Sequence, residues 1–398
     1  MTHMMTSDQR ITTRISTNEL ERRWSAVRRE MKARQVDALI IQATNDWLGG
    51  YVKWFTDLPA NNGYPRTVIF HANDDMTVIE MGPLGATRTL DRDPLHRGVG
   101  EVINSPSFLS IGYTHHYDAQ LAETVLKRRA YRTIGFVGKG AMQHAFVAFI
   151  EGSLTGTTFI DVEFVDFIKA IKSPEEIVLI RQAAKLQDAV FGEVLTYIKP
   201  GMRDIDVTAL AQREGQVRGS EQGIFLGSSA PLGTRSSFLP RFMQGRKLQK
   251  GDQLSLLIEN NGPGGFYTEI ARTVVLGKAS NELKDGFEAV REAQDYSLSL
   301  IRPGAACRDI HLAHNEYMER HGLPVELRLY AHGQGYDMVE RPLIRSDEKM
   351  TIEAGMNLAV HPGYETPSLF AVICDNYIVD EENAGVCLHS TPKQVFEI

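Results

Sequence analysis

The chain has 398 residues, of which 42% are hydrophobic and 23% charged, and its formal net charge is −7. This length allows two domains with sizeable cores. A mildly acidic chain without basic runs lacks the clustered positive charge that nucleic-acid-binding surfaces and contacts with anionic membranes require, so we expect neither partner. The composition and charge do not exclude a small-molecule substrate.

The three cysteines, Cys307, Cys374 and Cys387, lie far apart and form no CxxC pair. This pattern argues against a disulfide framework or a Cys-rich zinc site and favours a reducing compartment. The N-terminal residues lack the apolar core of a secretory signal, and the apolar stretch at 38–41 is far shorter than the roughly 20 residues of a membrane span. We therefore expect a cytoplasmic protein.

The first part of the chain alternates between two hydrophobic periods. Helical spacing and short apolar runs predict helices at 17–35, 119–129 and 142–151, and strands at 36–43, 66–72, 76–82 and 133–140. This alternation indicates an α/β domain that ends near residue 165.

A helix with a clear start signal follows. Ser173 can cap it, Pro174, Glu175 and Glu176 suit its first turn, and the pair at 200–201 is a Pro-Gly stop. The later patterns predict helices at 204–219, 281–301 and 307–321, strands at 253–259 and 266–276, and a loop rich in Gly, Ser and Pro at 223–240. The second half is therefore expected to be α+β.

Six phrases stand in a specific order in this half: IKSPEEIVLIRQAAKLQDAV, RKLQKGD, YTEIARTVVLG, IRPGAACRDI, AHGQG and AGMNLAVHPG. Together they resemble the creatinase, aminopeptidase P and methionine aminopeptidase superfamily. The resemblance implies a creatinase-like α/β N-terminal domain at 1–165 and an α+β catalytic domain of the pita-bread fold at 166–398. It also implies a homodimer in which the partner's N-terminal domain completes the active site.

Peptidases of this superfamily hold two divalent metals with Asp, Asp, His, Glu and Glu, and the corresponding positions are altered in this chain. The second Asp corresponds to Glu269, the His to His332 and the first Glu to His361. Two imidazoles and a carboxylate are a common ligand set for zinc or ferrous iron. The resemblance thus leaves room for one divalent metal (Zn, Fe or Mn), or for metal-free chemistry as in creatinase.

The two remaining ligand positions of the family lack the carboxylates that would bind a second metal. The first Asp corresponds to Ile258 or, in the register of the dimethylsulfoniopropionate lyases of this superfamily, to Leu257, with Glu259 at the second position. The last Glu corresponds to Cys374, beside Asp375. A single metal could therefore gain Glu259 or Asp375 as a further ligand, but two metals would find too few carboxylates.

Several side chains can carry proton transfer or substrate binding. Two close carboxylates raise each other's pKa, and a histidine titrates near neutral pH, so both types suit acid–base work. The candidate catalytic residues are His361, Glu269, His332, Glu259 and Asp337. The candidate substrate-binding residues are Trp54, Tyr64, Arg66, Glu340 and Tyr267. The aromatic cluster around Trp47 and Trp54 could hold a flat or cationic group at the mouth of the pocket.

Three functions follow from this reading. The first is a hydrolase that cleaves a C–N bond, or eliminates a leaving group, in a small polar metabolite and is not a dinuclear-metal peptidase. The second is a mononuclear metal-dependent lyase that resembles the dimethylsulfoniopropionate lyases. The third is a non-catalytic protein that binds a ligand or peptide. Creatine hydrolysis is not expected, because creatinase's catalytic positions correspond here to Pro240, Ala271 and His361.

Overall fold

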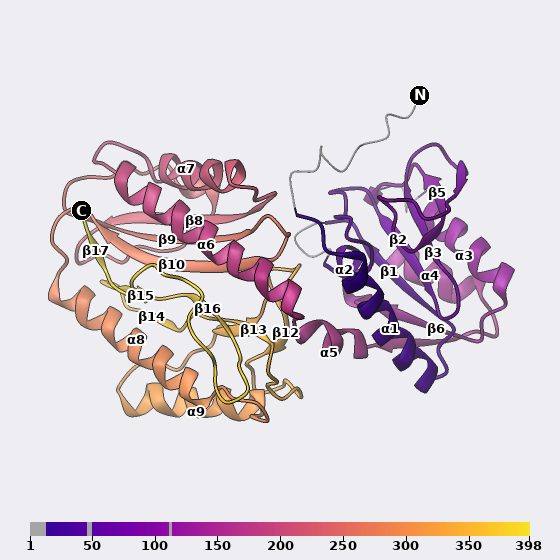
Figure 1. The fold of residues 1–398 in the computed structure, drawn as a ribbon. Helices are drawn as coiled ribbons and strands as arrows, with labels where there is room; N and C mark the ends of the chain where they lie inside the picture. Colours follow the sequence, from indigo (N-terminus) through magenta and orange to yellow (C-terminus); the bar gives the residue numbers. More distant parts are fainter. Residues whose placement is uncertain (1–12, 46–49, 111–113) are drawn as a thin grey trace. The chain divides into compact units, whose positions relative to one another are not determined.

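The computed structural model describes residues 13–45, 50–110 and 114–398. These residues form two compact units, one of residues 14–169 and one of residues 170–398 together with Thr13 (Figure 1). The sequence places the domain boundary between residues 165 and 166, and helix α5 (Phe164–Ala170) spans both positions.

The N-terminal unit is built on one mixed sheet of seven strands in the order β4-β5-β3-β2-β1-β6-β7. Its strands are β1 (Ala38–Ala43), β2 (Arg66–His71), β3 (Met76–Met81), β4 (Thr87–Thr89), β5 (Val99–Ser105), β6 (Thr133–Val137) and β7 (Thr158–Val162). Its other helices are α1 (Thr17–Ala33), α2 (Gly50–Thr56), α3 (Tyr117–Arg129) and α4 (His144–Ser153). The predicted helices and strands of this part are confirmed, and buried residues such as Ile40, Val125 and Phe146 form a shared core.

The C-terminal unit contains two four-stranded sheets, β17-β10-β9-β8 and β12-β11-β13-β16, and the hairpin β14-β15. The strands are β8 (Gly223–Pro231), β9 (Asp252–Asn261), β10 (Tyr267–Val275), β11 (Ala331–Gly333), β12 (Glu340–Leu343), β13 (Asn357–Val360), β14 (Gly363–Glu365), β15 (Phe370–Val372), β16 (Asp375–Ile378) and β17 (Phe396–Glu397). Figure 1 shows helices α6 (Pro174–Tyr197) and α7 (Asp204–Val217) on one side of the strands, and α8 (Asn281–Leu300) and α9 (Cys307–Arg320) on the other. This is the α+β arrangement that the sequence predicts.

Helix α6 starts at the predicted cap. The Ser173 hydroxyl accepts a hydrogen bond from the Glu176 amide at 3.2 Å, and the Glu176 carboxylate accepts one from the Ser173 amide at 2.7 Å. This reciprocal capping box satisfies two amides that a helix end leaves without partners. The predicted helix start is confirmed.

One predicted loop is wrong. Residues 223–231, expected to belong to a loop, form β8 and pair with β9 along their whole length. The glycines that suggested a loop are needed for close packing, since a Cβ atom at Gly223 would lie 2.5 Å from the Glu259 carbonyl oxygen and one at Gly227 would lie 2.9 Å from that of Ser255. Glycine within a strand often marks such a close approach.

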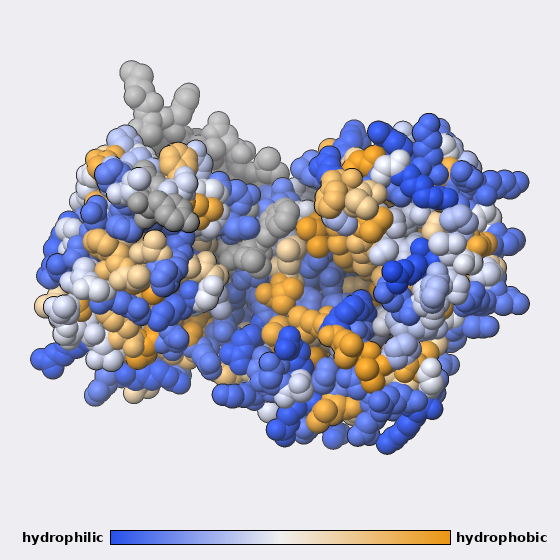
Figure 2. Space-filling model, turned by 180° about the vertical axis from the view of Figure 1, so that it is seen from behind, coloured by the Kyte–Doolittle hydropathy of each residue, from blue (hydrophilic) through white to orange (hydrophobic). Residues whose placement is uncertain are grey.

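Hydrophilic residues cover much of the face drawn in Figure 2, and hydrophobic residues gather there in patches. The most exposed large apolar side chains include Leu327 at 89% and Phe242 at 85%. Among the described residues, no helix combines the length and the apolar character needed to cross a membrane.

A buried histidine of α9 makes the stability of the C-terminal unit depend on pH. The Nδ1 atom of His314 lies 2.7 Å from the Ser297 hydroxyl, and its ring stacks on that of Tyr330 at 3.9 Å. Burial lowers the pKa of His314 to about 4. An unfolded chain has a histidine pKa of about 6.5, so the unfolded state binds more protons between these values and stability falls as pH falls.

We expect His314 to account for a loss of about 2 kcal/mol in the free energy of unfolding between pH 7 and pH 5. Urea unfolding at both pH values measures this difference. For each variant, we compare the free energy of unfolding at pH 7 with that at pH 5. In His314→Asn this difference should be smaller than in the wild type by about 2 kcal/mol. In His321→Asn, at an exposed position after the same helix, the difference should equal that of the wild type. An unchanged pH dependence in His314→Asn would contradict the assignment.

Candidate active site

A cavity of about 280 Å³ lies within the C-terminal unit. This volume is at the lower end of the range for small-molecule sites. The residues that line it are Phe238, Leu257, Glu259, Glu269, Arg328, Leu329, His332, Val339, His361, Val372 and Cys374. Four of the five predicted catalytic residues are therefore in one place, although they come from widely separated parts of the sequence.

The hairpin of β9 and β10 positions the two glutamates. Glu259 and Glu269 are direct cross-strand partners in this antiparallel pair, and such partners project on the same face of a sheet. Burial, with the negative charge of Glu269 as a second cause, raises the pKa of Glu259 well above its usual value. Glu259 therefore keeps its proton at pH values where an exposed glutamate has lost it.

A chain of amide groups connects the two glutamates. The Glu269 backbone N–H donates to Asn376 Oδ1 at 2.8 Å, Asn376 Nδ2 donates to Gln334 Oε1 at 2.8 Å, and Gln334 Nε2 donates to Glu259 Oε1 at 2.9 Å. A backbone N–H can only donate, so it fixes the direction of the whole chain. Glu259 Oε1 is thereby held as an acceptor.

Two histidines face the Glu269 carboxylate. His332 Nδ1 lies 2.9 Å from the Gly333 carbonyl oxygen, which can only accept, so Nδ1 donates this hydrogen bond and Nε2 is the ring nitrogen available to a cation. The Nε2 atoms of His332 and His361 lie 3.8 Å and 3.5 Å from Glu269 Oε1. Burial lowers the pKa of His361 to about 4, so its ring is neutral at pH 7.

We call Glu269, His332 and His361 the ligand triad. One ligand atom from each lies within 4.8 Å of the other two. Glu269 Oε1 and His361 Nε2 are buried and form no hydrogen bond with the residues that the structure describes. Buried polar atoms are rarely left in this state, and two imidazoles with one carboxylate suit zinc or ferrous iron. The residues present therefore fit one divalent cation.

The same residues do not fit a second cation. The sequence predicts Ile258 or Leu257 at the position of the first family Asp and Cys374 at that of the last Glu, and both Leu257 and Cys374 line the cavity. Burial, followed by the charge of Glu269, raises the pKa of the Cys374 thiol well above its usual value, so Cys374 supplies no thiolate at neutral pH. Within the described part of the chain, the cavity offers no acidic side chain besides the two glutamates.

Asp375 does not line the cavity and forms a buried ion pair with Arg272. Its Oδ1 atom accepts a hydrogen bond from Arg272 Nη2 at 2.7 Å, and both side chains are fully buried. Asp375 also lies close to Cys387 and His389, in an arrangement that a metal could use. The Arg272 guanidinium already supplies the positive charge there, so a cation would meet electrostatic repulsion.

The other predicted residues of this unit do not line the cavity. Glu340 accepts a hydrogen bond from the buried Lys172 Nζ at 2.9 Å and another from the Asp337 backbone N–H at 3.2 Å. Tyr267 is 1% exposed on β10, where its backbone N–H donates to the Gly335 carbonyl oxygen at 2.7 Å. Catalytic or substrate-binding roles for Asp337, Glu340 and Tyr267 stay predictions.

The predicted N-terminal residues make contacts within their own unit. Trp54 is 2% exposed in α2, and the Tyr64 ring packs 4.8 Å from a phenylalanine ring. Arg66 Nη2 lies 3.1 Å from Glu80 Oε2. Trp47 lies outside the described residues. A role for these side chains in substrate binding stays a prediction.

Two residues of the site were missed in the sequence. Arg328 lines the cavity, and Gln334 holds Glu259. Both stand close to His332 in the segment ELRLYAHGQG, so their proximity to a family site residue is the signal that could have found them. Their partners come from other segments, and sequence spacing gives no information about those.

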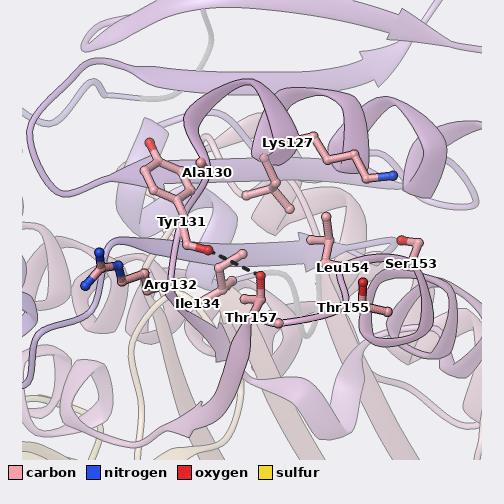
Figure 3. A pocket seen from close by; sticks show the side chains of 11 residues that line it. Lys127, Ala130, Tyr131, Arg132, Ile134, Ser153, Leu154, Thr155 and Thr157 are labelled. Atoms are coloured by element: carbon pink, nitrogen blue, oxygen red, sulfur yellow. Dashed lines mark hydrogen bonds between the residues drawn. The ribbon is translucent and has the colours of Figure 1, made fainter.

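A larger cavity, of about 390 Å³, lies in the N-terminal unit (Figure 3). Its lining includes Lys127, Arg132, Ser153 and Thr155, but no carboxylate, imidazole or thiol. The hydroxyl of Thr157 there donates to the Tyr131 carbonyl oxygen at 3.2 Å. Without acidic or imidazole groups this cavity offers neither cation ligands nor an acid–base pair, so the smaller cavity is the candidate active site.

Comparison with known proteins identifies the family. The sequence profile of metallopeptidase family M24 matches residues 178–381. The chain belongs to this family. The M24 match covers more than half of the sequence and contains all four acidic and imidazole residues of the cavity.

Relatives of this M24 member include three bacterial and archaeal proteins. The uncharacterized peptidase YqhT of Bacillus subtilis is 30% identical over 58% of this chain and 66% of its own length. The Xaa-Pro dipeptidase of Pyrococcus furiosus is 23% identical over 57% of this chain and 65% of its own length. The uncharacterized hydrolase/peptidase y4tL of Sinorhizobium fredii is 25% identical over 95% of this chain and 96% of its own length. The alignments with the first two thus span just under two thirds of those relatives.

Solved structures show the same fold over nearly the whole chain. The X-Pro aminopeptidase of Thermotoga maritima superposes with a TM-score of 0.75 at 16% identity, covering 94% of this chain and 99% of that protein. The dipeptidase PepE of Mycobacterium ulcerans gives 0.76 at 19% identity, covering 97% and 100%. The predicted fold, an α/β N-terminal domain followed by a pita-bread domain, is confirmed.

If Asp375 serves the structure through Arg272, Asp375→Asn should lower the free energy of unfolding by about 3–5 kcal/mol, because it leaves a buried guanidinium without its counter-charge. Urea unfolding measures the loss. Asp347→Asn removes the carboxylate of an exposed pair with Arg345 and should change stability by less than about 0.5 kcal/mol. An Asp375→Asn variant as stable as the wild type would refute this role.

Proposed function

We propose that this M24 protein is a hydrolase that uses one divalent cation, held by Glu269, His332 and His361, to cleave a C–N bond in a small polar metabolite. The observation that carries the proposal is the convergence of the ligand triad, in which two buried ligand atoms form no hydrogen bond with the described residues. The small cavity volume supports a small substrate.

The ligand triad, Glu259 and the apolar side chains of the cavity have different roles in this proposal. A divalent cation bound there would act as a Lewis acid on a carbonyl oxygen and lower the pKa of a water molecule. The hydrogen bond from His332 Nδ1 to the Gly333 carbonyl orients the ring and fixes its tautomer. Glu259, held by Gln334 beside Glu269, can give a proton to the leaving nitrogen. Apolar side chains around these groups limit access of bulk water.

Several relatives are named dipeptidases or aminopeptidases. Among the ligand positions of two-metal peptidases, this chain has Leu257 and Cys374 where carboxylates would be needed, and Asp375 is paired with Arg272. These differences support a one-cation enzyme with another substrate range. A homodimer with an active site completed by the partner's N-terminal domain, and a cytoplasmic location, stay predictions of this proposal.

Metal content tests the ligand triad. Protein purified without an affinity tag and incubated with Zn²⁺, Fe²⁺ or Mn²⁺ should retain one ion per chain by elemental analysis, because three protein ligands converge on one point. His361→Ala should retain at least ten-fold less. His321→Ala, which removes an exposed histidine, should bind like the wild type. Two ions per chain, or none, would overturn the proposal.

A second pair of variants separates cation binding from proton transfer. Glu269→Gln should lose the ion, whereas Glu259→Gln should keep it and lower kcat by about 10²- to 10⁴-fold, the usual contribution of a general acid. Amine release from a panel of N-acyl amino acids, small amides and dipeptides measures the activity. Full activity in Glu259→Gln would exclude the proposed proton donor.

A further inference from the structure

Among the described residues that line the candidate active site, Arg328 is the one arginine or lysine. Its side chain is 44% exposed, so it stands where the cavity meets the solvent. Arg328 is not a member of the ligand triad, and it has no role in the reaction proposed above. The hydrogen bonds of its guanidinium and the side chains around it indicate which kind of ligand Arg328 can bind.

A buried carboxylate fixes the guanidinium of Arg328. Nε donates to Glu326 Oε1 at 3.0 Å and Nη2 donates to Glu326 Oε2 at 2.6 Å. Glu326 is only 3% exposed. Nη2 also lies 3.4 Å from the carbonyl oxygens of His361 and Gly363. A two-pronged ion pair of this kind sets the plane of the guanidinium before any ligand arrives.

One nitrogen of this guanidinium, Nη1, remains available. Nε and Nη2 are engaged, but Nη1 forms no hydrogen bond with the residues that the structure describes. A guanidinium held in a fixed plane with free N–H donors is a preferred partner for a carboxylate. The contact of Nη2 with the His361 carbonyl places these donors next to a residue of the ligand triad.

Apart from Glu259 and the Cys374 thiol, the remaining described side chains of the cavity wall are apolar. Phe238, Val339, Val372 and Leu257 line it together with Arg328 and the ligand triad. A ligand that fills this space would contact hydrocarbon with its body and the guanidinium with one end.

We infer that Arg328 binds the carboxylate of the substrate, and that the substrate is a small N-acylated carboxylic acid with an apolar body. The inference rests on the proposed function for the bond that is cleaved. In that reaction the oxygen of water bonds to the acyl carbon, the C–N bond breaks, and the leaving nitrogen takes a proton. The products are a carboxylic acid and an amine, and no oxidant or reductant is required.

Binding of two probes of equal shape tests this specificity. 3-Methylbutanoate carries the carboxylate, and 3-methylbutanamide carries a neutral amide in its place. We expect EDTA-treated wild-type protein to bind the acid at least ten-fold more tightly than the amide by calorimetry or ligand-observed NMR. The EDTA treatment matters because a bound cation would itself attract the carboxylate.

Three variants sharpen the test. Arg328→Gln should abolish the preference for the acid. Arg328→Lys keeps a charge beside Glu326 but loses the planar fork, so it should fold like the wild type and still show a reduced preference. Arg345→Gln changes an exposed arginine outside the cavity and should behave like the wild type.

The outcomes separate the two proposals. Equal binding of acid and amide by EDTA-treated wild type, or an unchanged preference in both Arg328 variants, overturns the role of Arg328. A preference that appears only with zinc and persists in Arg328→Gln assigns the carboxylate to the cation and also overturns it. A preference that depends on Arg328 in a protein that binds no cation supports the carboxylate-binding role of Arg328 and refutes the proposed function, together with the N-acyl group assigned to the substrate.

Discussion

The pairing register of β9 and β10 is the constraint on which the site depends. It sets Glu259 opposite Glu269, and Leu257 opposite Ala271, on the face that borders the cavity. The alternate residues, such as Ile270, pack in the core beneath α6 and α7. A shift of one residue in either strand would turn its carboxylate into that apolar core, so burial of the hydrophobic face also fixes the position of the site.

Charge inside the cavity follows from this geometry. Two ionised carboxylates this deeply buried would repel each other, and the pair resolves this by keeping a proton on Glu259. The Glu269 carboxylate faces two imidazole nitrogens. A single divalent cation would match this arrangement, whereas a second would need carboxylates that Leu257 and Cys374 do not supply.

The sequence predicted the elements of the fold well where local signals were strong, as in the capped start of α6. It predicted the ligand triad because all three residues occupy positions within recognisable phrases. A structural Arg272 that pairs with carboxylates near the site was predictable, but its partner Asp375 was not, and neither was the position of Arg328 beside His361. These contacts depend on tertiary pairing between distant segments. The loop prediction failed at 223–231 for the same reason, since β8 pairs with β9 there and close strand packing requires those glycines.

X-ray absorption spectroscopy at the metal edge of the zinc-loaded protein tests the central claim most directly. The account predicts one zinc per chain, with two imidazole nitrogens and carboxylate oxygen in its first coordination sphere and no neighbouring metal. A sulfur ligand from Cys374, or a second metal within about 4 Å, would contradict it.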